Sequence, residues 1–172
     1  MSNDAAEARF RTVFAHLGAV TAYARRRGSP DPEGIGAEVM AIAWRRLADV
    51  PRDDPRPWLY ATARNLVWAE ARRAARAAEH GGREREPVAA PELLELDAEL
   101  AQALRSLSAS DREALLLVAW EELTPSQAAK ALGIKPAAFR VRLLRARRRL
   151  AARLAERPPG GPALALVDME GA

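Results

Sequence analysis

The 172-residue sequence contains no cysteine and only two histidines, and these shortages exclude several kinds of chemistry. Without cysteine the chain can form neither a disulfide framework nor a thiolate metal site. His16 and His80 lie far apart in the sequence, and nothing near either one completes a site, so we expect no metal and no cofactor. A phosphate-binding glycine loop and a nucleophile constellation are also absent, which argues against an enzyme.

Long apolar runs and a secretory signal are absent as well. A helix needs about 20 apolar residues to cross a bilayer, and no stretch of the sequence has them. The first ten residues, MSNDAAEARF, lack the basic start and apolar core of a signal peptide. We therefore expect a cytoplasmic protein with no membrane partner.

The whole chain has only a slight excess of positive charge, but this excess is strong near its C-terminal end. Lys and Arg number 27 against 23 Asp and Glu, a net charge of +4. From Lys135 to Arg157, however, nine basic residues stand against one acid, Glu156, whereas acids dominate from Glu84 to Glu122. This asymmetry predicts a polyanionic partner for the basic end.

The residues that are plentiful, Ala, Leu, Arg and Glu, predict an all-α fold, since no stretch alternates apolar and polar residues as a strand does. The apolar spacing of Phe10, Phe14 and Leu17 predicts one helix that ends near RRRGSPD. A second helix is expected to begin with Asp31 as N-cap and Pro32 at its first position. A third helix is expected to begin around DDPRPW, where Asp54 can cap it, and to run to HGG.

We expect two small helical domains joined by a flexible linker. The N-terminal domain is placed at residues 1–79 and the C-terminal domain, with a helix-turn-helix, at residues 92–157. The linker, residues 80–91, is rich in Gly, Pro and charge. Residues 158–172 are expected to be a disordered tail, with an apolar docking segment around Leu164, Leu166 and Val167 as the alternative.

The segment TPSQAAKALGIKP carries several signals of a helix-turn-helix. Thr124 and Gln127 have the spacing of a capping box, with Pro125 at the first helical position. Ala129 is small where two helices cross, and Gly133 supplies the permissive backbone of the turn. Ile134 is then expected in the core, and Pro136 begins the next helix.

The helix after Pro136 has two contrasting faces. At about 100° per residue, one narrow arc is apolar and predicts the buried face: Phe139, Leu143, Ala146 and Leu150. The opposite arc suits a DNA groove, because Arg can bond guanine and Val or Leu can contact a thymine methyl: Ala137, Arg140, Val141, Leu144, Arg145 and Arg148. On the flanks Arg142, Arg147 and Arg149 are expected to meet phosphates. The alternative is that the arginines only solubilise a terminal helix.

The region around this helix-turn-helix resembles the promoter-binding C-terminal domain of sigma factors, especially the extracytoplasmic-function (ECF) type. The likeness covers LRSLSASDREALLLVAWEELTPSQAAKALGIKPAAFRVRLLRARRRL. Two N-terminal segments are similar as well: DPEGIGAEVMAIAWRRL to the helix that grips the RNA polymerase clamp, and RPWLYATARNLVWAEARRAAR to the promoter-melting segment.

The resemblance implies three sets of site residues and no catalytic residue. The upstream, minus-thirty-five element would be read by Arg140, Val141, Leu144 and Arg145. The melting, minus-ten element would lie against Trp58, Asn65, Trp68, Arg72 and Arg73. The polymerase clamp would be met by Glu33, Ile35, Glu38, Val39, Ile42 and Arg45. Bundle core is the open alternative for Ile35, Val39, Ile42 and Trp58.

The sequence departs from the family pattern at several positions. Gly34 and Ala37 stand where the clamp helix usually carries an acid and a glutamine. Gly34 and Gly36 should each weaken that helix by roughly 1 kcal/mol relative to Ala. In the recognition helix Lys135, Pro136 and Val141 replace more typical residues, which predicts an unusual promoter preference.

Three functions are compatible with these features. The leading hypothesis is a sigma factor that binds core RNA polymerase and promoter DNA, with an anti-sigma factor as a partner common in the family. The second is a helix-turn-helix transcriptional regulator that acts without joining polymerase. The third, an enzyme with an appended DNA-binding domain, lacks any site for its chemistry.

Overall fold

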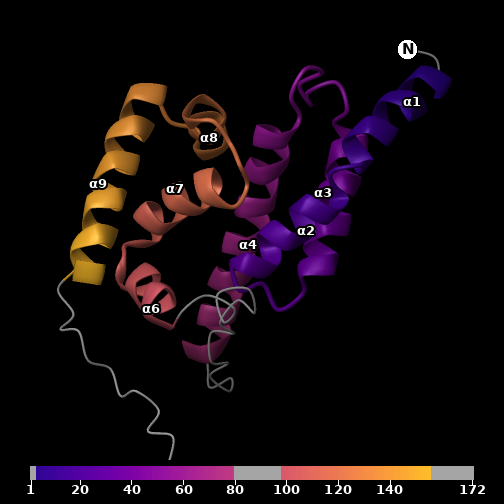
Figure 1. Cartoon of the computed structure of the whole chain (residues 1–172). Helices are drawn as coiled ribbons and strands as arrows, with labels where there is room; N and C mark the ends of the chain where they lie inside the picture. The colour runs from indigo at the N-terminus through magenta and orange to yellow at the C-terminus, as the bar shows by residue number, and fades with distance from the viewer. Residues whose placement is uncertain (1–2, 80–97, 156–172) are drawn as a thin grey trace, which may run out of the picture.

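The computed structural model describes residues 3–79 and 98–155, and every regular element within these two ranges is an α-helix. The all-α fold expected from composition and periodicity is confirmed. The helices form two groups (Figure 1): the N-terminal unit, residues 3–79, and the C-terminal unit, residues 98–155. The expected linker at 80–91 and tail at 158–172 lie outside the described residues.

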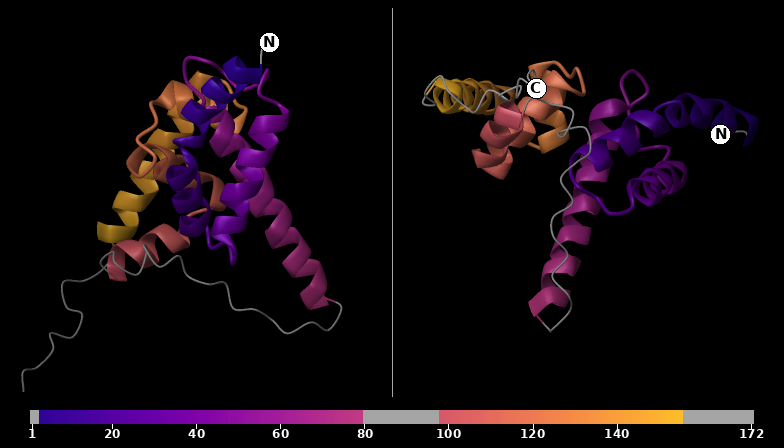
Figure 2. Two further views of the ribbon diagram at one scale, coloured as in Figure 1. Left: turned by 90° about the vertical axis from the view of Figure 1, so that its right-hand side faces the viewer. Right: turned by 60° about the horizontal axis from the view of Figure 1, so that its bottom comes forward.

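The N-terminal unit consists of α1 (Asn3–Phe14), α2 (Leu17–Arg26), α3 (Pro32–Arg45) and α4 (Arg56–Glu79). Helices α2, α3 and α4 contact one another in pairs, and α1 packs on α3. Val20, Tyr23, Val39 and Leu59 are almost completely buried between them. The C-terminal half of α4 extends beyond both units (Figure 2), and its side chains from position 71 to 77 are exposed.

The prediction of a single helix at the start of the chain is wrong, because this segment forms two helices, α1 and α2. Between them the His16 N–H donates to the Val13 carbonyl, one residue short of the α-helical spacing. His16 has φ −89° and ψ 2°, and no side chain caps α2. Val13 and Val20 are both buried, on α1 and α2 respectively. The bend therefore follows from packing and has no proline or capping signal in the sequence.

The expected start of α3 is confirmed, and its N-cap explains why position 34 is a glycine. The Asp31 carboxylate accepts a hydrogen bond from the Gly34 N–H at 2.9 Å, with Pro32 in the first turn. A Cβ on Gly34 would lie 2.1 Å from the Asp31 Oδ2, and one on Gly36 would lie 2.4 Å from the Thr21 Oγ1. Both glycines thus leave room for a neighbour: Gly34 for the cap and Gly36 for the approach of α2.

The C-terminal unit consists of α6 (Ala98–Ser106), α7 (Ala109–Ala119), α8 (Pro125–Leu132) and α9 (Pro136–Ala155). Helix α9 packs on α6, α7 and α8. The core of the C-terminal unit contains Leu104, Leu107, Leu117 and Phe139.

The predicted helix-turn-helix forms from α8 and α9. The Gln127 N–H donates to the Thr124 Oγ1 (3.3 Å) and the Thr124 N–H donates to the Gln127 Oε1 (2.7 Å), which completes the capping box. Gly133 ends α8 with φ 65°, and the Ile134 N–H reaches back to the Ala129 carbonyl. Such a left-handed cap turns the chain sharply toward α9.

The two units pack against each other rather than standing apart. Helix α4 contacts α8, and buried residues of both units belong to one continuous apolar cluster. Asp54, expected to cap α4, accepts a hydrogen bond from the Gln127 Nε2 of α8 at 2.7 Å. The described residues therefore show a closed arrangement in which the helix-turn-helix lies beside α4 (Figure 1).

We predict opposite stability effects for Gly133→Ala and Gly18→Ala. Neither added Cβ meets an atom within 4 Å, so only the backbone conformation differs. At φ 65° an alanine costs about 1 kcal/mol, whereas exposed Gly18, in helical α2, gains a few tenths up to about 1 kcal/mol. Urea unfolding of both variants measures the difference, and a stabilised Gly133→Ala protein would contradict this account of the turn.

Candidate nucleic-acid interface

Helix α9 has a buried face and an opposite exposed face, as its periodicity predicted. Phe139, Leu143 and Ala146 are buried, and Leu150 packs partly buried against the same core. On the other side Val141 and Leu144 are 48% and 49% exposed. Between and around them stand exposed arginines: Arg140, Arg145 and Arg148. Every charged residue of α9 is an arginine, so this face is uniformly positive.

The three flanking arginines have different surroundings. Arg147 is exposed, and Arg142 is half-buried. Arg149 donates to the carboxylate of Asp111, which is buried on α7. Arg149 therefore attaches α9 to α7, a role that the sequence did not indicate, while its side chain remains 60% exposed.

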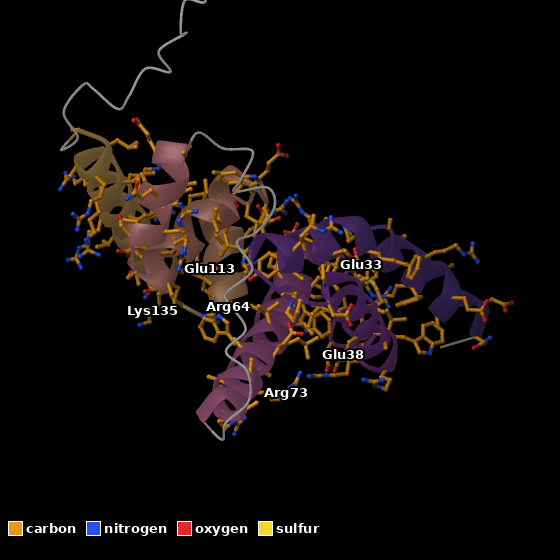
Figure 3. All side chains as sticks on the ribbon, turned by 90° about the horizontal axis from the view of Figure 1, so that it is seen from below. Glu33, Glu38, Arg64, Arg73, Glu113 and Lys135 are labelled. Carbon is orange, nitrogen blue, oxygen red and sulfur yellow. The ribbon has the colours of Figure 1, made fainter. Side chains whose placement is uncertain are left out.

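The residues expected at the melting element lie along α4. Asn65, Trp68, Arg72 and Arg73 are exposed, with Trp68 at 44%. Trp58 instead packs partly buried against the core, so the core alternative describes it better. The Arg64 guanidinium lies 3.6 Å from the centre of the Trp68 ring and covers one face of it. Figure 3 shows Arg64 and Arg73 on this helix.

The residues expected at the polymerase clamp divide into two sets on α3. Ile35 (6% exposed) and Val39 (0%) are core residues, so the expectation that they face a partner is corrected. The apolar stripe of α3 must cover α2 and α4, and it cannot face outward at the same time. Glu33, Glu38 and Arg45 are exposed and Ile42 is half-buried. Glu33 also pairs with Arg25 on the surface at 2.5 Å.

A buried group of charged and polar residues between the units was not predicted from the sequence. It consists of Tyr23, Arg26 and Arg27 at the end of α2, Glu113 of α7, and Glu121 just after α7; we call it the ion cluster. Arg27 pairs with Glu113 at 2.9 Å and with Glu121 at 3.2 Å, and Arg26 pairs with Glu121 at 2.6 Å. The Tyr23 hydroxyl donates to Glu113 at 2.7 Å. Glu113 is labelled in Figure 3.

Aromatic rings and burial reinforce the ion cluster. The Arg27 guanidinium lies 3.3 Å from the centre of the Tyr23 ring, and that ring stacks on Tyr60 of α4. Burial raises the pKa of Tyr23 well above 10.0, against the positive charge of Arg27 and with the help of Glu113. Burial, aided by Glu121, raises the pKa of Tyr60 to about 12. Both phenols are therefore neutral hydrogen-bonding groups near neutral pH.

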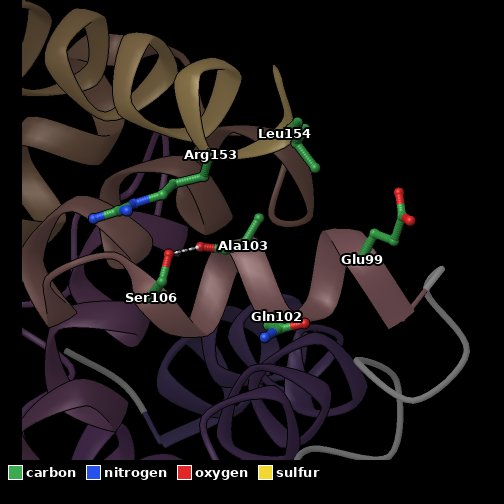
Figure 4. A pocket seen from close by; sticks show the side chains of 6 residues that line it. All are labelled: Glu99, Gln102, Ala103, Ser106, Arg153 and Leu154. Atoms are coloured by element: carbon green, nitrogen blue, oxygen red, sulfur yellow. Dashed lines mark hydrogen bonds between the residues drawn. The ribbon is translucent and has the colours of Figure 1, made fainter. Parts of the chain in front are cut away.

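Other kinds of site are not visible in the described part of the chain. Residues 3–79 and 98–155 contain no group of His, Asp and Glu that could hold a metal ion. Among the described helices none is long and apolar enough to cross a membrane. A surface hollow between α6 and α9 (Figure 4) has no nucleophile and base side by side, and its lining is mixed: Glu99, Gln102, Ala103, Ser106, Arg153 and Leu154.

Comparisons with known proteins agree with the helix-turn-helix. Residues 97–150 match the sigma-70 region 4 family. No curated protein matches the sequence significantly.

Solved structures extend the likeness to both units. The structure of CnrH in complex with the cytosolic domain of CnrY is similar with 29% identity and a TM-score of 0.62, over 85% of this chain and 87% of that chain. The sigma factor RpoE in complex with the anti-sigma factor NepR from Bartonella quintana has the same fold, with 21% identity and a TM-score of 0.64, over 86% and 97%.

We predict that Phe139→Ala and Leu144→Ala separate folding from DNA binding. Phe139 is fully buried, so its truncation should lower the free energy of unfolding by about 3–5 kcal/mol. Leu144 is half-exposed, so its truncation should change stability by less than about 0.5 kcal/mol and weaken DNA binding. Urea unfolding and DNA titration measure the two effects. If the Leu144→Ala variant bound DNA with unchanged affinity, Leu144 would not be part of the DNA interface.

Proposed function

We propose that this chain, a sigma factor of the ECF type by its region 4 domain and its fold, directs core RNA polymerase to a specific class of promoters and assists their opening. One observation carries the proposal: a region 4 helix-turn-helix presents a positive face with exposed Val141 and Leu144. Exposed apolar side chains among arginines suit base edges in a major groove better than they suit water.

We assign reading of the upstream element to the exposed face of α9. Arg140 and Arg145 offer bidentate bonds to guanine, and Val141 and Leu144 offer contacts to thymine methyls. Arg142 and Arg147, on the flanks, would meet phosphates and fix the register of the helix, while Arg148 lies on the groove-facing side. Arg149 would also contact a phosphate, in addition to its bond to Asp111.

We assign promoter melting to the exposed face of α4. The Trp68 ring, 44% exposed, can stack on an unpaired base, because aromatic stacking on single strands does not depend on sequence. Asn65 offers hydrogen bonds to a base edge, and Arg72 and Arg73 offer charge for the backbone. Polymerase docking is assigned to the outward side of α3, with Glu33, Glu38, Ile42 and Arg45.

The remaining parts of the proposal concern partners and place of action. The protein carries no catalytic chemistry of its own and acts in the cytoplasm, where polymerase and promoter DNA are. An anti-sigma factor is a further proposed partner, because RpoE was solved with one bound.

Transcription with purified core polymerase tests this function against a regulator that acts alone. Adding the protein to core enzyme on a genomic promoter library should produce a set of new, shared start sites, and the two should elute as one complex. Transcripts identical with and without the protein, together with no complex, would refute the sigma-factor function.

Arg145→Ala and Arg147→Ala test the division between base and phosphate contacts. Arg145→Ala should cost about 1–3 kcal/mol on the cognate upstream element and relax specificity at one position. Arg147→Ala should weaken binding about equally on all sequences and reduce the salt dependence. Titrations of both variants on cognate and scrambled duplexes measure this. If Arg145→Ala weakened every duplex equally, Arg145 would be a phosphate contact.

A further inference from the structure

Arg64, to which the sequence assigned no role, lies among the residues that we assign to promoter melting. At about 100° per residue, Arg64, Asn65, Trp68 and Arg72 fall within one arc of about 100° on α4. Arg64 precedes Trp68 at the i, i+4 spacing, at which two side chains of one helix are neighbours. Figure 3 labels it. Any nucleic acid that lies on Trp68 would therefore lie beside Arg64.

The Arg64 side chain lies on the Trp68 ring at the expense of a hydrogen bond. It is half-buried, and its guanidinium carbon lies 3.6 Å from the centre of the Trp68 ring. Within residues 3–79 and 98–155 its Nε is the one buried side-chain nitrogen or oxygen without a hydrogen-bond partner. A buried N–H without an acceptor is costly, and an arginine extended into water would avoid this cost. The attraction between the guanidinium and the indole offsets it.

The Trp68 ring gains a defined orientation from this contact. Its side chain is 44% exposed, so the core of the N-terminal unit covers only part of it. A side chain that is free to change rotamer loses this freedom when a ligand binds, and the loss weakens binding. A ring that Arg64 already holds has less freedom to lose. Because aromatic rings bind unpaired bases by stacking, holding the ring should strengthen its contact with a base.

We propose that Arg64 is a positioning residue for promoter opening: its guanidinium holds the Trp68 ring in the orientation in which the ring stacks on an unpaired base. This inference rests on the proposed function, in which Trp68 lies against the melting element. Arg72 and Arg73 would offer charge to the DNA backbone directly, whereas Arg64 acts through Trp68. Loss of Arg64 should thus matter chiefly where a base is present.

Fluorine NMR of the full chain tests the contact without DNA. The chain has four tryptophans, so labelling with fluorotryptophan gives four resonances, and Trp68→Phe identifies the one from position 68. Arg64→Met keeps the length of the side chain and removes its charge, so it should shift that resonance more than the other three. Arg76→Met is the matched control, because Arg76 lies on the same helix and its Nε donates to the Arg72 carbonyl. A position-68 resonance that Arg64→Met leaves unmoved would overturn the inference.

Binding to a premelted promoter tests the consequence for DNA. The unpaired strand of the melting element is either intact or abasic, and each variant binds it together with core polymerase. Arg64→Met should weaken binding to the intact strand about two- to tenfold. On the abasic strand its effect should be no larger than that of Arg76→Met. Trp68→Ala should weaken binding to the intact strand about five- to a hundredfold, and adding Arg64→Met to it should cost no more than adding Arg76→Met.

The outcomes separate this inference from the proposed function. Equal losses of Arg64→Met on intact and abasic strands would make Arg64 a phosphate contact and overturn its positioning role. An unchanged protein that did not prefer the intact strand would instead refute the assignment of Trp68 to melting, and this inference with it. Arg64→Lys keeps the charge without the planar guanidinium, so it should show part of the loss. It replaces Arg64→Met if circular dichroism shows that the latter does not fold.

Discussion

The contact of Phe139, Leu143 and Ala146 with the core of the C-terminal unit determines which way the rest of α9 faces. Once this stripe is buried, helical geometry alone places Arg140, Val141, Leu144 and Arg145 on the outside. The capping box at Thr124 and the left-handed Gly133 fix where α8 begins and ends, and so they fix the start of α9. Arg149 adds a bond to buried Asp111 on α7. The surface that we propose faces DNA is thus a consequence of the buried one.

The same unit also makes polar contacts with the N-terminal unit. Through Glu113 and Glu121 it binds the end of α2, and through Gln127 it binds Asp54. In the proposed function, the upstream element would be read by the outer face of α9, which these contacts leave exposed. The contact between the units therefore combines buried ion pairs with apolar packing of α4 on α8.

Local signals in the sequence predicted local structure well. Capping at Asp31 and Thr124, the turn at Gly133 and the buried stripe of α9 all depend on residues within a few positions of each other. The break near His16 was missed because no proline, glycine turn or cap marks it. Ile35 and Val39 fit either a core or an interface, and only the packing of α3 on α2 and α4 decides for the core.

Sequence patterns could not predict the contacts between distant segments of the chain. Arg26 and Arg27 end a helix, where basic residues are common, so nothing marks them as buried. Glu113 and Glu121 flank the apolar run ALLLVAW, and acids in such a place were the one available signal of a buried partner. Their partners stand more than eighty residues earlier in the chain.

Photocrosslinking from two positions of one chain tests the central claim most directly. A photoreactive residue replaces Leu144 on α9 in one protein and Trp68 on α4 in another, each assembled with core polymerase on the same promoter. Our account predicts that position 144 attaches to bases of the upstream element and position 68 to the melted region, about 25 base pairs downstream. Attachment of both positions to one element, or none from position 144, would contradict it.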